Sequence, residues 1–147
     1  MHIFTVLFAT IGATSAMTLF SYFVSAKWKK QFREPQLLQM IVGQHPKFTD
    51  ERKQKIAGWF IHYSIGLMFI IVYDLIWTNT FLDPTWFCGI LFGIASGVIG
   101  IFGWRTIFGL APRIPRIDFK AYYLHLMIAH IVFALVAVAV YALADQS

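Results

Sequence analysis

Four long apolar runs, separated by short polar segments, make up most of the chain. They cover about residues 2–26, 56–78, 86–104 and 121–144, and Asp74 is the one Asp, Glu, Lys or Arg residue within them. An α-helix needs about 20 predominantly apolar residues to cross the hydrocarbon core of a bilayer. Each run therefore predicts one membrane-spanning helix. We expect an all-α fold, a four-helix transmembrane bundle that forms a single domain over residues 1–147.

The segment between the first two runs predicts a further, shorter helix. Pro35 suits the first turn of a helix and Gly43 can end it. The apolar side chains between them are Leu37, Leu38, Met40, Ile41 and Val42. We expect an amphipathic helix that lies at the cytoplasmic membrane interface and acts as an anchor and orientation signal, with regulated binding of a lipid or partner as the alternative. Thr49 is the expected N-cap of the next helix.

Basic residues are confined to two segments of the chain. Of the twelve Lys and Arg residues, eight lie within 27–55 and four within 105–120. Because short basic loops stay on the cytoplasmic side of a membrane, both termini and the 78–85 turn should lie outside. Basic side chains are attracted to anionic headgroups. The expected headgroup contacts are Lys27, Lys29, Lys30, Arg113 and Arg116.

The composition excludes several classes of protein. About 59% of the residues are apolar and 13% are charged, whereas a soluble domain averages about 45–50% and 25%. The net charge of +5 reflects membrane orientation, so nucleic acid is not an expected partner. The single cysteine, Cys88, rules out an internal disulfide and a cysteine-cluster metal site.

Glycines recur at a helical spacing in the third run. Gly89, Gly93 and Gly97 lie at i, i+4 and i+8, so they share one face of the expected helix. Small residues let two membrane helices approach closely. This face can pack against another helix of the same chain, or it can form the interface of a homo-oligomer or larger membrane complex.

Three histidines lie deep within the spans, where ionisable groups are costly and suggest function. His62, His125 and His130 fall at overlapping depths in the inner half of the membrane, and His125 and His130 are about 140° apart around their helix. At most one of them should face His62. His62 and one of these two histidines can together hold haem b. Alternatively, the histidines bond to neighbouring helices as neutral rings, or they relay protons. Asp74 either reaches headgroup water or binds a cation or proton, about 15 Å or more from the histidines.

No catalytic motif stands out in the chain, so we expect that the protein is not an enzyme. The expected function is an accessory or interaction subunit of a membrane assembly. The alternatives are a haem-binding or small-ligand-binding protein that uses the intramembrane histidines, or a component that handles protons or ions.

Several stretches of the chain together resemble small bacterial inner-membrane proteins of the YagU-like kind. The stretches are Gly12–Thr18, His62–Gly66 through Tyr73, Gly89–Gly93 through Trp104, Arg105 and Pro112, and His130 through Tyr141. The resemblance implies a location in a bacterial inner membrane and a connection with acid tolerance. It implies no particular reaction, cofactor or site.

Overall fold

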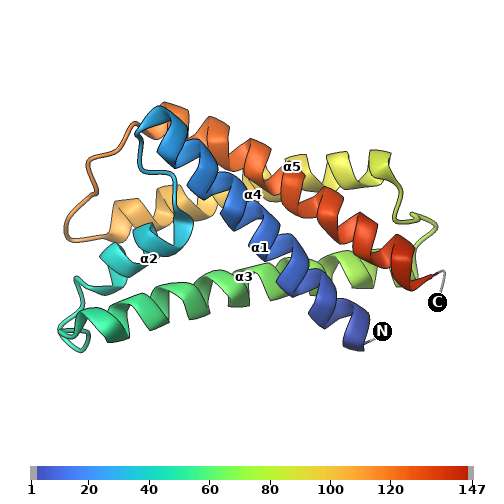
Figure 1. Cartoon of the computed structure of the whole chain (residues 1–147), viewed down its shortest axis with the longest axis horizontal. Coiled ribbons are helices and arrows are strands. Elements are labelled where there is room, and N and C mark those ends of the chain that lie inside the picture. Colours follow the sequence, from blue (N-terminus) through green and yellow to red (C-terminus); the bar gives the residue numbers. More distant parts are fainter. Residues whose placement is uncertain (1–2, 146–147) are drawn as a thin grey trace.

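The computed structural model describes residues 3–145, which form five α-helices and no strands (Figure 1). The helices are α1 (Ile3–Trp28), α2 (Glu34–Val42), α3 (Glu51–Asn79), α4 (Trp86–Leu110) and α5 (Phe119–Ala144). All except α2 are long and apolar enough to cross a membrane. The predicted all-α architecture with four spans is therefore confirmed.

Helix α1 packs against both α3 and α5, and α4 packs mainly against α5. The consecutive helices α3 and α4 touch through aromatic side chains near the turn that joins them, where the ring centroids of Tyr73 and Phe92 are 5.0 Å apart. Elsewhere they make little direct contact. The bundle is therefore open between α3 and α4 along part of its length.

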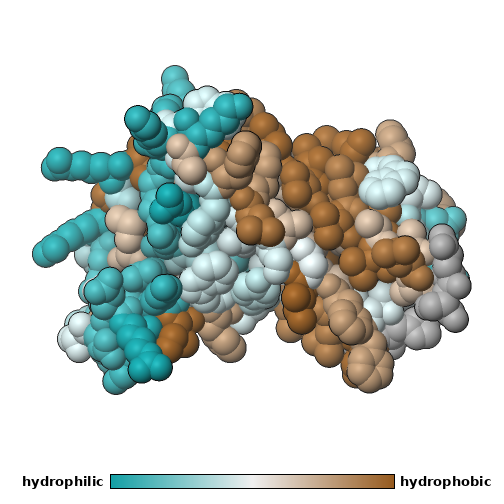
Figure 2. All heavy atoms as spheres, in the orientation of Figure 1, coloured by the Kyte–Doolittle hydropathy of each residue, from teal (hydrophilic) through white to brown (hydrophobic). Residues whose placement is uncertain are grey.

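The molecule has one hydrophilic end and a broad apolar body (Figure 2). We call the hydrophilic end the basic end, because the segments 27–55 and 105–120 lie there. The first and last described residues lie together at the opposite end (Figure 1). Large apolar side chains on the outer faces of the four long helices are more than 60% exposed: Phe4, Phe8, Leu19, Phe23, Phe60, Phe102 and Leu124. Such a surface matches lipid as the solvent.

The start of α3 and the end of α4 differ from the sequence prediction. Asp50, not Thr49, is the N-cap of α3, and its carboxylate accepts a hydrogen bond from the Arg52 backbone N–H at 3.0 Å. Helix α4 continues beyond Trp104 to Leu110 and ends just before Pro112, since a proline disfavours helical geometry in the residue that precedes it. The extra turns contain charged residues, so they lie outside the apolar runs. The runs marked only the part of each helix that spans the hydrocarbon.

The predicted short helix is confirmed as α2, with Pro35 in its first turn and Gly43 as its C-cap. Its apolar face is buried against the bundle, since Leu37 and Leu38 are almost inaccessible. A Cβ added at Gly58 of α3 would come within 2.7 Å of the Pro35 carbonyl oxygen, so this glycine allows α2 to pack closely on α3. This packing also buries Glu34, the first residue of α2.

The glycine face of α4 is covered by α5. An added Cβ at Gly93 would lie 2.5 Å from the Ile131 Cα atom, and one at Gly97 would lie 3.2 Å from the Met127 Cα atom. An added Cβ at Gly89 would lie 3.0 Å from the Cγ2 atom of the Val138 side chain. Of the two uses predicted for Gly89, Gly93 and Gly97, the structure therefore has packing within the chain.

Candidate functional site

Helices α1, α2 and α5 bring together a buried serine, glutamate and histidine. Ser21 donates a hydrogen bond to the Glu34 Oε1 atom at 2.9 Å and lies 2.9 Å from the His125 Nε2 atom. His125 Nε2 is 3.6 Å from Glu34 Oε1. Because the single hydroxyl hydrogen of Ser21 goes to Glu34, His125 Nε2 is the donor to Ser21. Aromatic rings of Phe20 and Phe32 stack on His125, with centroid distances of 5.3 and 4.8 Å.

Glu34 was missed by the sequence prediction, which counted Asp74 as the one buried acid and placed it far from the histidines. In the structure Glu34 is only 2% exposed and forms a pair with His125. The sequence offered one signal, an acidic residue directly before Pro35 at the start of the amphipathic helix. The burial itself results from packing between segments distant in sequence, which the pattern of residues does not define.

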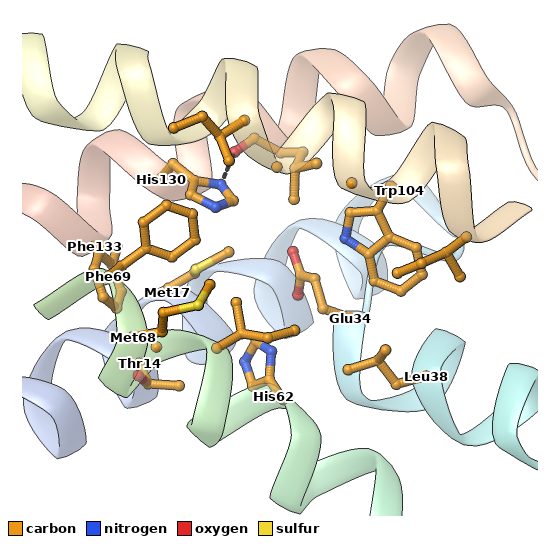
Figure 3. Close-up of a pocket in the computed structure, with 17 residues that line it drawn as sticks. Thr14, Met17, Glu34, Leu38, His62, Met68, Phe69, Trp104, His130 and Phe133 are labelled. Carbon is orange, nitrogen blue, oxygen red and sulfur yellow. Dashed lines mark hydrogen bonds between the residues drawn. The ribbon is translucent and has the colours of Figure 1, made fainter. Parts of the chain in front are cut away.

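His62 and His130 line a cavity near the centre of the molecule (Figure 3). The His62 Nε2 atom lies 2.8 Å from Thr18 Oγ1, and Thr18 itself donates to the Thr14 carbonyl. The His130 Nδ1 atom donates to the Leu126 carbonyl oxygen at 2.8 Å. Gly100 of α4 leaves room for the His130 ring, since a Cβ there would come within 2.8 Å of it.

The cavity has a volume of about 200 Å³ and an almost entirely apolar wall. Its lining comes from all five helices, and the polar or ionisable side chains that reach it include Glu34, His62 and His130. Figure 3 shows the Glu34 carboxyl between Trp104 and His62. On the α3 and α4 side, Met68 and Ile99 belong to the lining and are more than half exposed on the outside of the bundle. The cavity therefore reaches the apolar outer surface between α3 and α4.

The arrangement of the three predicted cofactor-binding histidines bears on the haem alternative. His125 Nε2 is already bonded to Ser21, and stacked rings enclose the imidazole. Met17 and Met68 are drawn between the rings of His62 and His130 in Figure 3. The cavity is also smaller than the ~300–1,000 Å³ of sites that enclose a whole ligand. This arrangement does not favour haem held between two of the histidines.

The same geometry bears on the proton-relay alternative. Each histidine bonds to a different group, namely Thr18, Ser21 or the Leu126 carbonyl. Within the described residues no hydrogen-bonded chain joins the three rings. Relay among the histidines therefore has no path of direct protein contacts.

Ser21, His125 and Glu34 are residue types of a catalytic triad, but their roles differ from those of a triad. In a triad the acid orients the histidine, and the serine is open to substrate. Here Glu34 accepts the hydrogen of Ser21 itself, and Ser21 is fully buried and lies outside the cavity lining. The cluster therefore has no position at which a substrate carbonyl can reach the serine oxygen.

Asp74 is buried at the opposite end of the bundle, which excludes the predicted contact with headgroup water. It is 2% exposed, and the Tyr141 hydroxyl donates a hydrogen bond to its Oδ1 atom at 2.9 Å. Its Oδ2 atom and the Trp77 Nε1 atom have no partner within residues 3–145. Asp74 therefore joins α3 to α5, apart from the histidine-lined cavity.

The five predicted headgroup residues are all exposed at the basic end. Lys30 also forms an ion pair with Asp118, with 2.6 Å between its Nζ atom and Oδ2, and Lys27 lies over the Trp28 ring. The Arg113 backbone forms two hydrogen bonds with the Gln44 side chain. Because they are exposed, these side chains can reach lipid phosphates. The contacts of Lys30 with Asp118 and of Arg113 with Gln44 also connect helix ends to loops.

Among residues 3–145, no three His, Cys, Asp or Glu side chains gather closely enough to hold a metal ion. Comparison of the chain with protein-family models, curated proteins and solved structures finds no match. The geometry of the cavity is therefore the basis for the functional proposal.

Proposed function

We propose that the protein binds a small lipid-soluble molecule within the membrane, in the cavity that Glu34 and two histidines line. The supporting observation is the cavity itself, which is apolar except for a few buried polar groups. Ligand sites commonly combine a mainly apolar wall with a small number of placed polar groups. This is the small-ligand alternative of the sequence analysis, with Glu34 added to the site. His125 does not line the cavity and is linked to Glu34 by Ser21.

The route of entry follows from the packing of the bundle. Helices α3 and α4 make little contact beside the cavity, and exposed Met68 and Ile99 lie at its rim. A molecule dissolved in the bilayer would meet this opening from the side. At about 200 Å³ the cavity suits a small molecule or the head of a longer one whose remainder stays in lipid.

An accessory subunit that binds its partner through the glycine face has less support. Gly89, Gly93 and Gly97 already face α5, so that surface is unavailable to another chain. A partner would have to use a different face of the molecule. Binding of a small molecule requires no such additional surface.

We also propose that the basic end faces the cytoplasm, with both ends of the described chain on the outer side of a bacterial inner membrane. The confinement of all Lys and Arg residues to one end supports this orientation. The resemblance to YagU-like proteins supports the membrane type. In this orientation Glu34 lies in the cytoplasmic half of the bundle.

The binding function can be tested by photolabelling of the protein in liposomes. The probe is a medium-chain alkanol with a diazirine in its chain, and peptide mass spectrometry locates the label. We expect label on cavity residues of α3 and α4, such as Met68, Phe69 and Ile99. Gly103→Leu should abolish most of it, because Gly103 lines the cavity and has space for a side chain.

Gly109→Leu is the matched control for that variant. Gly109 also lies in α4 with free space around it, but it is outside the cavity lining. Its labelling should equal that of the unmodified protein. Label spread evenly over lipid-facing residues, and unchanged by Gly103→Leu, would contradict the proposed function.

A further inference from the structure

The buried carboxyl group of Glu34 has one oxygen atom left over. Its Oε1 atom accepts the hydrogen bond from Ser21, whereas its Oε2 atom has no hydrogen-bond partner within residues 3–145. Burial of such an atom is costly unless something bonds to it. Figure 3 shows the carboxyl directed into the cavity. The cavity therefore contains an acceptor that lacks a donor.

A donor without an acceptor lies on the neighbouring wall. Trp104 lines the cavity and is buried, and Figure 3 shows its indole nitrogen on the side that faces Glu34. Glu34 Oε2 has no partner, so the two groups do not bond to each other, and no hydrogen bond of the indole nitrogen occurs among residues 3–145. The indole N–H can only donate. The two side chains thus present one acceptor and one donor to the same space.

From this pairing we propose that the ligand is a lipid-soluble molecule with a neutral hydroxyl head, an alcohol or phenol. Its hydroxyl donates to Glu34 Oε2 and accepts from the Trp104 indole N–H. Its apolar body passes Met68 and Ile99 and leaves the bundle between α3 and α4. The inference rests on the proposed function and specifies its ligand class.

Other head groups satisfy the site less well. An ether oxygen can accept from Trp104 but has no hydrogen to donate to Glu34. A protonated amine can donate but cannot accept. A fatty acid would place a second carboxyl group beside Glu34, and two carboxylates that share a site repel each other. A hydroxyl group meets both requirements without adding charge.

Matched probes separate the ligand class from the proposed function. The alkanol probe is compared with its methyl ether and with the corresponding primary amine, all with the same diazirine-bearing chain. The alkanol should label the cavity at concentrations about tenfold lower than the ether, which corresponds to the loss of one hydrogen bond. Equal labelling by the ether, or stronger labelling by the amine, would overturn the hydroxyl assignment and leave the binding function standing.

If none of the three probes labels the cavity, the proposed function itself fails. Two variants then assign the contacts on the protein side. Trp104→Phe keeps an aromatic ring but removes the donor, so it should weaken labelling by both the alkanol and the ether. Glu34→Gln should weaken labelling by the alkanol and leave the ether unaffected.

Each variant has a control of the same chemical change away from the cavity. Trp86→Phe and Glu51→Gln alter exposed residues outside the cavity lining and should leave all labelling unchanged. If Glu34→Gln does not fold, the comparison of alkanol with ether on the unmodified protein still decides the inference. Loss of alkanol labelling in the control variants, or its persistence in both cavity variants, would contradict the proposed contacts.

Discussion

Ser21 joins two ionisable side chains within a membrane-spanning bundle. Its hydroxyl oxygen accepts from His125 and its hydrogen goes to Glu34, so one small side chain satisfies an acceptor on α2 and a donor on α5. Buried polar groups that lose their partner are costly. Ser21 is therefore expected to stabilise the contact of α1 with both helices.

The substitution Ser21→Ala tests this role. It leaves the Glu34 carboxyl without its serine donor and His125 without its acceptor, so the free energy of unfolding should fall by about 1–3 kcal/mol. Unfolding in mixed micelles, followed by circular dichroism, gives the value. Ser64→Ala is the control, because Ser64 is exposed and bonds only to the Phe60 carbonyl of its own helix. Equal stability of the two variants would argue against the role of Ser21.

At the scale of elements, the contact between α4 and α5 depends on glycine. Gly93→Ala places a Cβ 2.5 Å from the Ile131 Cα atom, so the two backbones must separate. Overpacking of this kind costs about 1–3 kcal/mol, which exceeds the ~1 kcal/mol gained in helix propensity.

Gly109→Ala makes the same change at a position with free space and should leave stability equal or higher. Thermal unfolding in detergent compares the two variants. A Gly93→Ala protein as stable as Gly109→Ala would show that α4 and α5 do not approach each other so closely.

The start of α5 has its own dependence on pH. Asp118 caps the helix and pairs with Lys30, and this hydrogen bond from Lys30 lowers the pKa of the Asp118 carboxyl below its usual 3.8. A carboxyl whose pKa is lowered on folding stabilises the fold above its unfolded pKa. That contribution is lost as the pH falls through the lower folded pKa.

The thermal midpoint should therefore fall as the pH drops below about 3.8, and Asp118→Asn should remove part of that fall. Asparagine retains the capping oxygen, so the variant isolates the charge. Asp83→Asn, at an exposed position in the 80–85 turn, is the control and should keep the full dependence. An unchanged pH profile in Asp118→Asn would exclude the contribution of this ion pair.

At the scale of the whole molecule, the four spans and one basic end support the proposed orientation in the membrane. In a Cys88→Ser background, Asp83→Cys should react with a membrane-impermeant maleimide added to intact cells. Lys47→Cys, at the basic end, should react only after the membrane is permeabilised. The Cys88→Ser protein without a further cysteine is the control, and the reverse pattern of labelling would invert the proposed topology.

Much of the architecture could be predicted from the residues alone, because it depends on local properties. Run length and charge defined four spans, and Pro35 and Gly43 marked α2. The spacing of Gly93 and its neighbours identified a close-packing face, since helical periodicity is a property of the segment itself. The error at Thr49 was one residue, because Asp50 beside it can also cap a helix.

Tertiary structure decided which polar groups meet. Sequence placed His62, His125 and His130 within the membrane spans, but Thr18, Ser21 and the Leu126 carbonyl became their partners only through the rotation and neighbours of each helix. Glu34 belongs to a short polar segment by sequence, and packing of α2 onto α3 places it inside the bundle. The four spans follow from the transfer of each segment between water and lipid, whereas the site depends on contacts between segments distant along the chain.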